Sequence, residues 1–401
     1  MKTLKISIIC IFCALLIQAI LLPQVFAGGS SMEQRILKIE TALGLNANSG
    51  ISIEERVAAI EKEMAKPEET ADLKAQGGPM GEISEWVTLS GGIEVEMGFE
   101  SSDVNNANNS DVSLATAELG IEASPQDWLT GFMLIKWEDE DDKMIVDEAH
   151  ITLGSTDEIP YYLSAGKIYV PFGLFETMMI SDPITLDIAE TVDNTIQVGF
   201  EMKGIRSAVY AFNGEAEEAV DKDDTIDVFG VSLGYAKEND EFSFDFGVDW
   251  VNNILESGGF RDVYNNNGWA ATLDDQVPGF AIHAMATFGP VCLIGEYIAM
   301  TDDVKAVGGA RILEEISAYS LEAGYTFEMS GFETTLAIGY QASDYAADIL
   351  PESKFLTSIG VGLTDNLSLA LEYSKAENNS VVDSGDGDKF DTITTQLAFE
   401  F

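Results

Sequence analysis

The chain has 401 residues and is strongly acidic, with 21 Lys and Arg against 69 Asp and Glu and a formal net charge of −48. A surface of this sign repels phosphate backbones, so nucleic acid is excluded as a partner. The acid excess either keeps loops and refolding intermediates soluble or creates an internal field that favours cations. The mean hydropathy is nonetheless slightly positive, at +0.07.

The N-terminal residues predict an export signal. Lys2 and Lys5 precede an apolar run over 6–22, and Val25-Phe26-Ala27 supplies a small-residue cleavage site. We therefore expect residues 1–27 to be a signal peptide cleaved after Ala27, with a retained membrane anchor as the alternative. Because two of the three cysteines lie inside this segment, the mature chain keeps Cys292 alone and cannot form an internal disulfide.

Residues 28–66 have a helical period that differs from everything downstream. Apolar residues recur at spacings of three and four, flanked by Glu and Lys, at Ile36, Ile39, Leu43, Ile53, Val57, Ile60 and Met64. This pattern predicts a short periplasmic helical or coiled-coil segment that makes the protein a homo-oligomer. The alternatives are a helix packed on the mouth of the barrel predicted below, or a frayed segment. A linker over 67–85, rich in Glu, Ala, Gly and Pro, follows it.

From Trp86 onward the period changes to two. Apolar side chains alternate with polar or small ones in segment after segment, for example at Val87, Leu89, Ile93, Val95, Met97 and Phe99. Beyond the N-terminus, no apolar run reaches the length of a membrane helix. Strands that are apolar on one face are typical of a barrel that contacts outer-membrane lipid. We predict an all-β fold over 86–401, a transmembrane antiparallel β-barrel of about sixteen strands.

The connectors and the C-terminus favour the same fold. Turn-like connectors such as 202–204, 289–290 and 364–366 alternate with long polar ones, as in outer-membrane barrels. Residues 391–401 form an alternating strand that ends on Phe401. It resembles the C-terminal strand of bacterial outer-membrane barrels, which closes the barrel and is read by the barrel-insertion machinery. An ordinary half-buried strand of a soluble sandwich is the alternative for this segment alone.

The long connector over 171–193 carries more apolar residues than a free surface loop should. A loop of this length needs a structural reason, and we expect it to fold back into the lumen and narrow it. The segment around it resembles the siderophore porin family of the LbtU type. The resemblance lies in Asp147-Glu148-Ala149, Gly166-Lys167, Val170-Pro171-Phe172-Gly173, Ile180-Ser181-Asp182-Pro183 and Gln197-Val198-Gly199-Phe200-Glu201.

This resemblance implies an outer-membrane channel for a ferric siderophore. The region before Trp86 is too short and too helical for a plug domain, so we expect facilitated diffusion. A carboxylate-rich ferric siderophore would be an anion and would need a cationic path, for which Lys136, Lys167 and Arg206 are the candidates. If these cations instead pair with the connector acids Glu176, Asp182, Asp187 and Glu190, a general and weakly cation-selective pore is expected. Tyr169 and Phe172, where the connector begins, are assigned to the same constriction.

Other chemistry has less support. His150 and His283 show no nucleophile at a catalytic spacing, so we do not expect an enzyme or a cofactor. The acidic stretches 138–142 and 383–388 could hold Ca²⁺, although the second lacks the terminal Glu of an EF-hand. A second class of function is a structural or adhesive envelope barrel with a filled lumen. Small polar residues on the inward faces favour a channel.

Overall fold

The computed structural model describes residues 86–103, 108–138, 143–154, 159–214, 225–239, 242–267, 273–345, 349–379 and 387–401. All of these residues belong to the second of the two units into which the chain divides, 86–401. The predicted signal peptide, helical segment and linker therefore lie outside the described residues. None of the described helices combines the length and the apolarity needed to cross a membrane.

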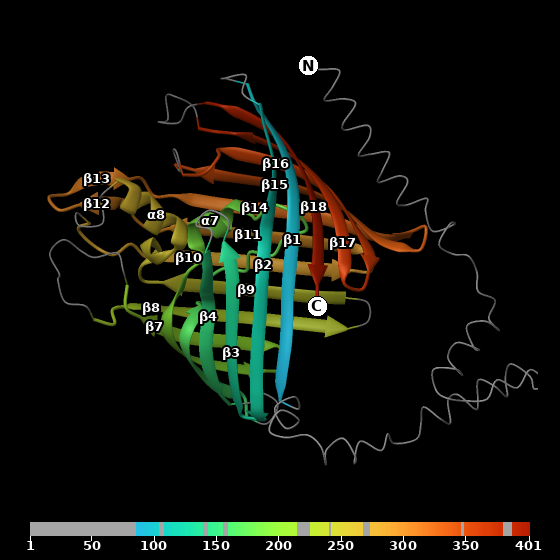
Figure 1. Cartoon of the computed structure of the whole chain (residues 1–401). Helices are drawn as coiled ribbons and strands as arrows, with labels where there is room; N and C mark the ends of the chain where they lie inside the picture. Colours follow the sequence, from blue (N-terminus) through green and yellow to red (C-terminus); the bar gives the residue numbers. More distant parts are fainter. Residues whose placement is uncertain are drawn as a thin grey trace, which may run out of the picture. The chain divides into compact units, whose positions relative to one another are not determined.

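The second unit is a closed antiparallel barrel of sixteen strands, which confirms the predicted fold class (Figure 1). Each barrel strand pairs with the next barrel strand along the chain, and β1 pairs with β18 to close the ring. The barrel strands are β1 (Val87–Ser102), β2 (Asn108–Gln126), β3 (Leu129–Glu138), β4 (Lys143–Leu153), β5 (Tyr161–Tyr169), β6 (Val192–Met202), β7 (Ile205–Phe212), β8 (Val228–Asn239), β9 (Phe242–Val251), β10 (Gly279–Phe288), β11 (Val291–Met300), β14 (Ser317–Met329), β15 (Phe332–Asp344), β16 (Ser353–Thr364), β17 (Leu367–Glu377) and β18 (Lys389–Glu400).

The C-terminal strand closes the barrel at its last residue. The backbone of Phe401 exchanges two hydrogen bonds of 3.0 Å with Gly91, and the paired register continues to Ser102 opposite Phe390. A closed ring leaves no strand edge unpaired, which is the condition for placing a sheet in hydrocarbon. The chain end is therefore part of the hydrogen-bonded wall.

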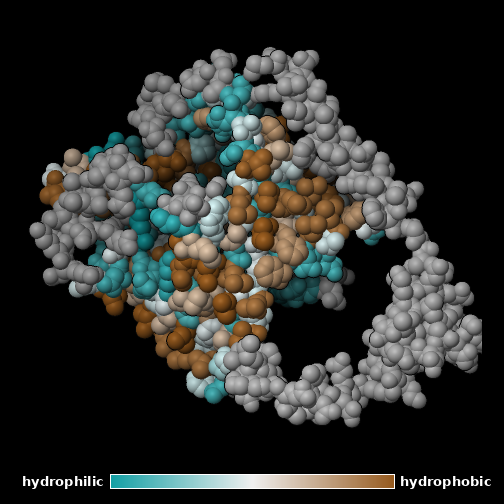
Figure 2. Space-filling view, in the orientation of Figure 1, coloured by the Kyte–Doolittle hydropathy of each residue, from teal (hydrophilic) through white to brown (hydrophobic). Residues whose placement is uncertain are grey.

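The outer surface of the wall is apolar. On β9, Phe246, Val248 and Trp250 are about 40% exposed, whereas the alternating inward residues Asp249 and Val251 are at most 4% exposed. A soluble sandwich would show the opposite pattern. Figure 2 shows hydrophobic residues over much of the visible outer wall. This inverted burial is expected of strands that contact lipid.

Two ends of the barrel can be told apart by their connectors. At one end, which we call the short-turn end, pairs such as Lys203-Gly204 link neighbouring strands. Both residues have positive φ angles, 55° and 85°, which is the backbone of the tight hairpin turn that matches strand twist. At the opposite end, the long-loop end, the connectors 170–191, 252–278 and 301–316 carry structure of their own.

These long connectors form an apolar core inside the barrel. They contain α7 (Ile184–Ala189), η1 (Ile254–Glu256), α8 (Gly258–Asn267) and the small hairpin β12 (Val304–Ala306) and β13 (Ala310–Leu313). Figure 1 shows α7 near β11 and β14, with α8 beside it toward the β12–β13 hairpin. Ile188, Phe260 and Ile316 from three different connectors are fully buried together against inward residues of β7 and β11. The sequence predicted a small, polar lumen lining, and this apolar core on one side of the lumen was missed.

The outward face of β1 offers a test of lipid contact. Ile93, midway between Trp86 and Phe99, faces outward and is 45% exposed. We expect Ile93→Arg to lower the free energy of unfolding from lipid vesicles by about 2–4 kcal/mol, because a charge then faces hydrocarbon. Urea titration followed by tryptophan fluorescence measures this. The matched control is Glu94→Arg on the inward face, for which a smaller loss is expected. Equal losses in the two variants would contradict the assignment of faces.

Candidate functional site: a folded-in connector and its acidic constriction

The connector over 170–191 leaves β5, crosses the inner face of the barrel and returns to β6. It has no regular structure until α7, so most of its backbone N–H groups need acceptors outside the connector. The barrel wall supplies them as carboxylates on inward positions of β9, β11, β14 and β17. The prediction that this connector folds into the lumen agrees with these contacts.

The first two anchors hold the start of the connector. Gly173 N donates to Asp249 Oδ2 at 3.0 Å, and Leu174 N donates to Glu296 Oε1 at 2.6 Å. The second oxygen of Glu296 accepts a hydrogen bond of 2.6 Å from the Thr185 hydroxyl in α7. One buried carboxylate on β11 therefore joins two separate points of the connector.

The next two anchors hold its middle. Glu322 on β14 accepts hydrogen bonds of 2.7 Å from Met178 N and from the Thr177 hydroxyl. Glu372 on β17 accepts from Ile180 N at 2.7 Å, from Ser181 N at 3.1 Å and from the Ser181 hydroxyl at 2.7 Å. Hydrogen bonds to an ionised acceptor are stronger than neutral ones. Both carboxylates are at most 5% exposed and are therefore committed to holding the connector.

A half-buried lysine completes the anchoring near Glu372. Lys354 on β16 donates from Nζ to the Ser181 hydroxyl at 3.0 Å. Its ammonium also interacts electrostatically with Glu372, Asp182 and Asp187. A cation at this position offsets part of the negative charge that the anchoring carboxylates bring into the lumen. Lys354 and the four anchoring carboxylates were not among the site residues predicted from the sequence. Strand alternation alone would have placed Glu322 and Glu372 on inward faces.

The acidic side chains of the connector lie on its solvent-facing side. Glu176, Asp182 and Asp187 are exposed and Glu190 is half-buried. Although water reaches these groups, the surrounding wall partly desolvates them. This burial raises the pKa of Asp187 to about 6, with Lys354 opposing the shift and Asp182 adding to it. Burial also raises the pKa of Asp182 and Glu190, and the charge of Lys136 opposes both shifts.

Lys136 is the cation that faces these acids. It lies on the inward face of β3, paired across the ladder with Glu118 of β2. Among the described residues its side chain makes no ion pair within 4.0 Å and no hydrogen bond. Glu94 and Glu96 of β1 lie on the same inward surface, and Glu96 accepts a hydrogen bond of 3.0 Å from Gln396. The constriction thus sets acids of the connector against a wall that carries further acids and one lysine.

The other two predicted cations do not supply a cationic path. Lys167 alternates with the buried Ser164 and Ile168 of β5, so it faces outward, and its Nζ donates to the Val146 carbonyl at 2.8 Å. Arg206 does face the lumen, but it forms a two-pronged ion pair with Asp245 of β9, with bonds of 2.6 and 2.8 Å. Its partner is a wall residue and not one of the connector acids that we named.

The two predicted aromatic residues are also committed to the fold. Phe172 is 2% exposed and belongs to the apolar core, so it does not line a solvent path. The Tyr169 hydroxyl donates to Asp147 Oδ2 at 2.9 Å, which ties the end of β5 to a bulge in β4. Both residues position the connector where it leaves the wall.

The histidines and the acidic stretches add no separate site. His283 lies between Asp245 and Asp249, with nitrogen to oxygen distances of 3.8 and 3.6 Å, and His150 Nδ1 is 3.9 Å from Glu148. The described residues contain no group of three or more His, Cys, Asp or Glu side chains arranged to hold a metal. Residues 139–142 and 380–386, which carry most of the predicted Ca²⁺ stretches, lie outside the described residues, so that site stays a prediction.

Comparison with known proteins places the barrel among porins by fold. No family model matches the chain. A UPF0422 protein of Coxiella burnetii is 25% identical over 314 residues, which are 75% of this chain and 66% of that protein. The UPF0422 protein lpl2888 of Legionella pneumophila is 21% identical over 72% of this chain and 58% of its own length. The chain thus spans between 58% and 66% of the length of these relatives.

Solved structures with the same fold are more distant in sequence. An anion-selective porin from Comamonas acidovorans has a TM-score of 0.57 at 14% identity and covers 79% of this chain and 99% of its own. The outer-membrane channel DcaP of Acinetobacter baumannii has a TM-score of 0.55 at 16% identity, covering 79% and 97%. Salmonella typhi OmpF in complex with daunomycin has a TM-score of 0.54 at 13% identity, with the same coverage. The fold of this chain is therefore that of porin barrels.

Removal of one anchoring carboxylate tests whether the connector is held as described. In Glu372→Ala, the amides of Ile180 and Ser181 lose their acceptor. We expect hydrogen exchange in 176–183 to accelerate by about 10- to 100-fold, since each bond to a charged acceptor is worth about 1–3 kcal/mol. Exchange followed by mass spectrometry measures this. Glu96→Ala is the control, because Glu96 does not bond the connector. Unchanged exchange in Glu372→Ala would show that the connector is held in another way.

Proposed function

We propose that this protein is an outer-membrane channel for the diffusion of small solutes and that its constriction prefers cations. The apolar outer wall and the closed ring support the membrane setting. The connector anchored across the lumen supports a role in solute passage, because a pore is narrowed in this way by a segment held inside the barrel. Cleavage of the N-terminal signal and insertion by the barrel machinery remain predictions that accompany the proposal.

The preference for cations is expected because accessible acidic side chains outnumber basic ones at the constriction. Asp182 and Glu190 interact electrostatically with Lys136, and Asp187 lies beside them on the connector. Glu94, Glu96 and Glu118 extend the acidic surface on the wall near Lys136. Lys354 is half-buried and donates a hydrogen bond to Ser181, Lys167 faces outward and Arg206 is paired with Asp245. A ring of carboxylates raises the local concentration of cations and repels anions. The excess of acidic residues seen in the whole sequence is therefore also found at the connector over 170–191, which crosses the lumen.

We further propose that the transported solute is a ferric siderophore, as the resemblance to the siderophore porin family implies. An acidic constriction admits a neutral or cationic ferric complex more readily than a carboxylate-rich anionic one. We therefore expect uptake of a labelled cationic ferric hydroxamate by cells that carry the protein. The control is a ferric complex of similar size with a net negative charge. Equal uptake of both complexes, or faster uptake of the anion, would contradict this substrate class.

The reversal potential in a planar bilayer under a KCl gradient tests the cation preference. We expect the wild-type protein to favour K⁺ over Cl⁻, and Lys136→Gln to increase the permeability ratio because the lumen loses its facing cation. The double variant Asp182→Asn, Glu190→Gln should lower the ratio. Lys167→Gln is the matched control, since it removes the same charge from an outward position and should leave the ratio unchanged. Anion preference in the wild-type protein would overturn the proposal.

The raised pKa of Asp187 predicts a pH dependence of the same ratio. Because the carboxyl is ionised above about pH 6 and neutral below it, the cation preference should fall as the pH drops from about 7.5 to about 5 through that value. Asp187→Asn should remove this part of the pH dependence and start from a lower ratio at the higher pH. A variant with the same pH profile as the wild-type protein would show that Asp187 is not the group that titrates.

A further inference from the structure

The second internal connector, 252–278, lies against the returning half of the first. η1 and α8 place Gly258 N within 3.0 Å of the Glu190 carbonyl, to which it donates a hydrogen bond. The next residue, Gly259, packs so closely on α7 that a Cβ atom there would overlap the carbonyl oxygen of Asp187. The close approach therefore requires glycine at this position. Two constriction acids, Asp187 and Glu190, have their backbones in contact with the first turn of α8.

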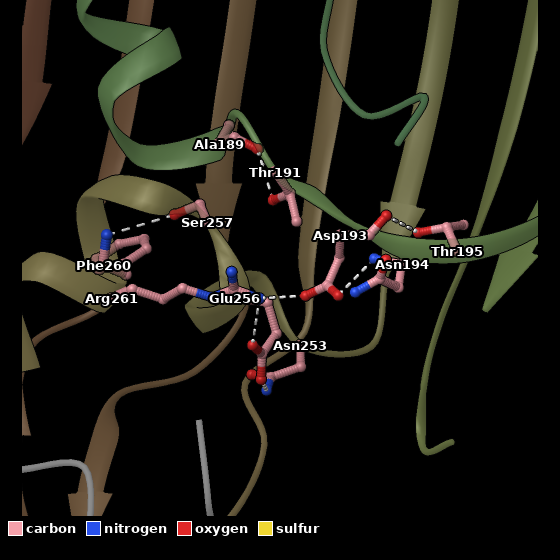
Figure 3. A network of polar contacts seen from close by, with 10 residues as sticks. All are labelled: Ala189, Thr191, Asp193, Asn194, Thr195, Asn253, Glu256, Ser257, Phe260 and Arg261. Atoms are coloured by element: carbon pink, nitrogen blue, oxygen red, sulfur yellow. Dashed lines mark hydrogen bonds and ion pairs between the residues drawn. The ribbon is translucent and has the colours of Figure 1, made fainter. Parts of the chain in front are cut away.

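Arg261 extends this contact to the start of β6. Its Nη2 donates to Asp193 Oδ2 at 2.5 Å and to Glu256 Oε2 at 3.1 Å, so it joins the 252–278 connector to the first residues of β6 (Figure 3). The guanidinium is 16% exposed, Asp193 12% and Glu256 only 1%. Charge pairs with this little exposure are weakly screened, and loss of one partner leaves a charge in a poorly hydrated place.

The surrounding bonds fix both ends of this bridge. Arg261 N donates to the Ser257 carbonyl at 2.9 Å within α8, and Asn253 Nδ2 donates to Glu256 Oε1 at 3.1 Å. On the other side, the Thr191 hydroxyl donates to the Ala189 carbonyl at 3.1 Å, which tightens the end of α7 (Figure 3). The contacts at residues 187, 190 and 193 follow one another at a regular spacing. They form one continuous seam between α8 and the segment that carries the acids.

We propose that Arg261 is a positioning residue of the constriction: from α8 it fixes residues 187–193 and, through them, the acidic groups of Asp187 and Glu190 that face the lumen. The inference rests on the proposed channel function and adds a determinant of its selectivity that does not itself line the ion path. The 252–278 connector therefore supports residues 187–193 from the side of α8, and we call this support the brace. The positions of the Asp187 and Glu190 side chains depend on it.

Two variants of the Arg261–Asp193 ion pair distinguish an effect of lost positioning from an effect of changed net charge. Arg261→Gln removes the bridge and also leaves unbalanced negative charge on Asp193 and Glu256. The double variant Asp193→Asn, Arg261→Gln removes the same bridge but keeps the net charge of the Asp193–Arg261 pair. We expect both variants to change the K⁺ to Cl⁻ permeability ratio by about twofold or more and to raise the open-channel current noise. Arg261→Lys, which retains the charge and one ion pair, should recover part of the wild-type ratio.

Gly259→Ala tests the same seam without any change of charge. The added methyl group meets the Asp187 carbonyl, so α7 must move, and we expect the permeability ratio and the noise to change in the same direction as in the double variant. Heat-modifiable gel mobility identifies folded barrels, and only folded protein is measured. This steric variant keeps the test available if a variant of the ion pair fails to fold.

Two results would overturn the inference. A wild-type ratio in the double variant would show that Arg261 acts only through its charge, and wild-type ratios in all four variants would show that the brace does not position the acids. Hydrogen exchange of 184–193 gives a readout that does not depend on ion conduction, with faster exchange expected in Arg261→Gln. If the wild-type protein conducts no ions, the proposed function fails, whereas the exchange result still decides whether the brace exists.

Discussion

The backbone of the connector over 170–191 crosses the lumen with little regular structure of its own, so its N–H groups must find acceptors on the barrel wall. Asp249, Glu296, Glu322 and Glu372 provide them from inward positions of four strands. A carboxylate can accept several such bonds, and each bond partly offsets the cost of removing its charge from water. The arrangement of everything else in the lumen follows from these contacts, because they decide which side of the connector faces the solvent.

Because of these contacts, one side of the lumen is filled by an apolar core and the other is acidic and accessible to solvent. Toward β7–β11 and β14, α7 and α8 pack on the wall and form an apolar core. Toward β1–β3, the inward residues remain accessible to solvent and carry Glu94, Glu96, Glu118 and Lys136. The acids of the chain thus have two roles. Some anchor the connector and are buried, whereas Asp182, Asp187 and Glu190 face the solvent-accessible side. This division explains how one strongly acidic chain can hold an internal segment tightly and still present negative charge to a passing ion.

The sequence predicted the barrel well because side-chain alternation is a local property that each strand shows by itself. The strand number follows from this repeated alternation. The inward folding of 171–193 was predicted from the apolar content of a long connector, and the closing role of the last strand from its resemblance to other barrel strands. The outward orientation of Lys167 could not be predicted from alternation. Strand β5 carries Ser164, Gly166 and Ile168 on its inward face and so lacks a clear alternation of polar and apolar residues. The partner of Arg206, the burial of Phe172 and the bridge from Arg261 to Asp193 were not predictable, since they join residues that only the closed barrel brings together.

Thiol modification in the lumen shows whether the anchored connector lies in the path of the ions. In a Cys292→Ser background, Asp182→Cys places one thiol on the solvent-facing side of the anchored connector. We expect a cationic methanethiosulfonate reagent to react faster than an anionic one of similar size, because the neighbouring acids attract it, and we expect either reagent to reduce the single-channel conductance. Complete modification of the introduced thiol without any change in conductance would show that the connector lies outside the path of the ions.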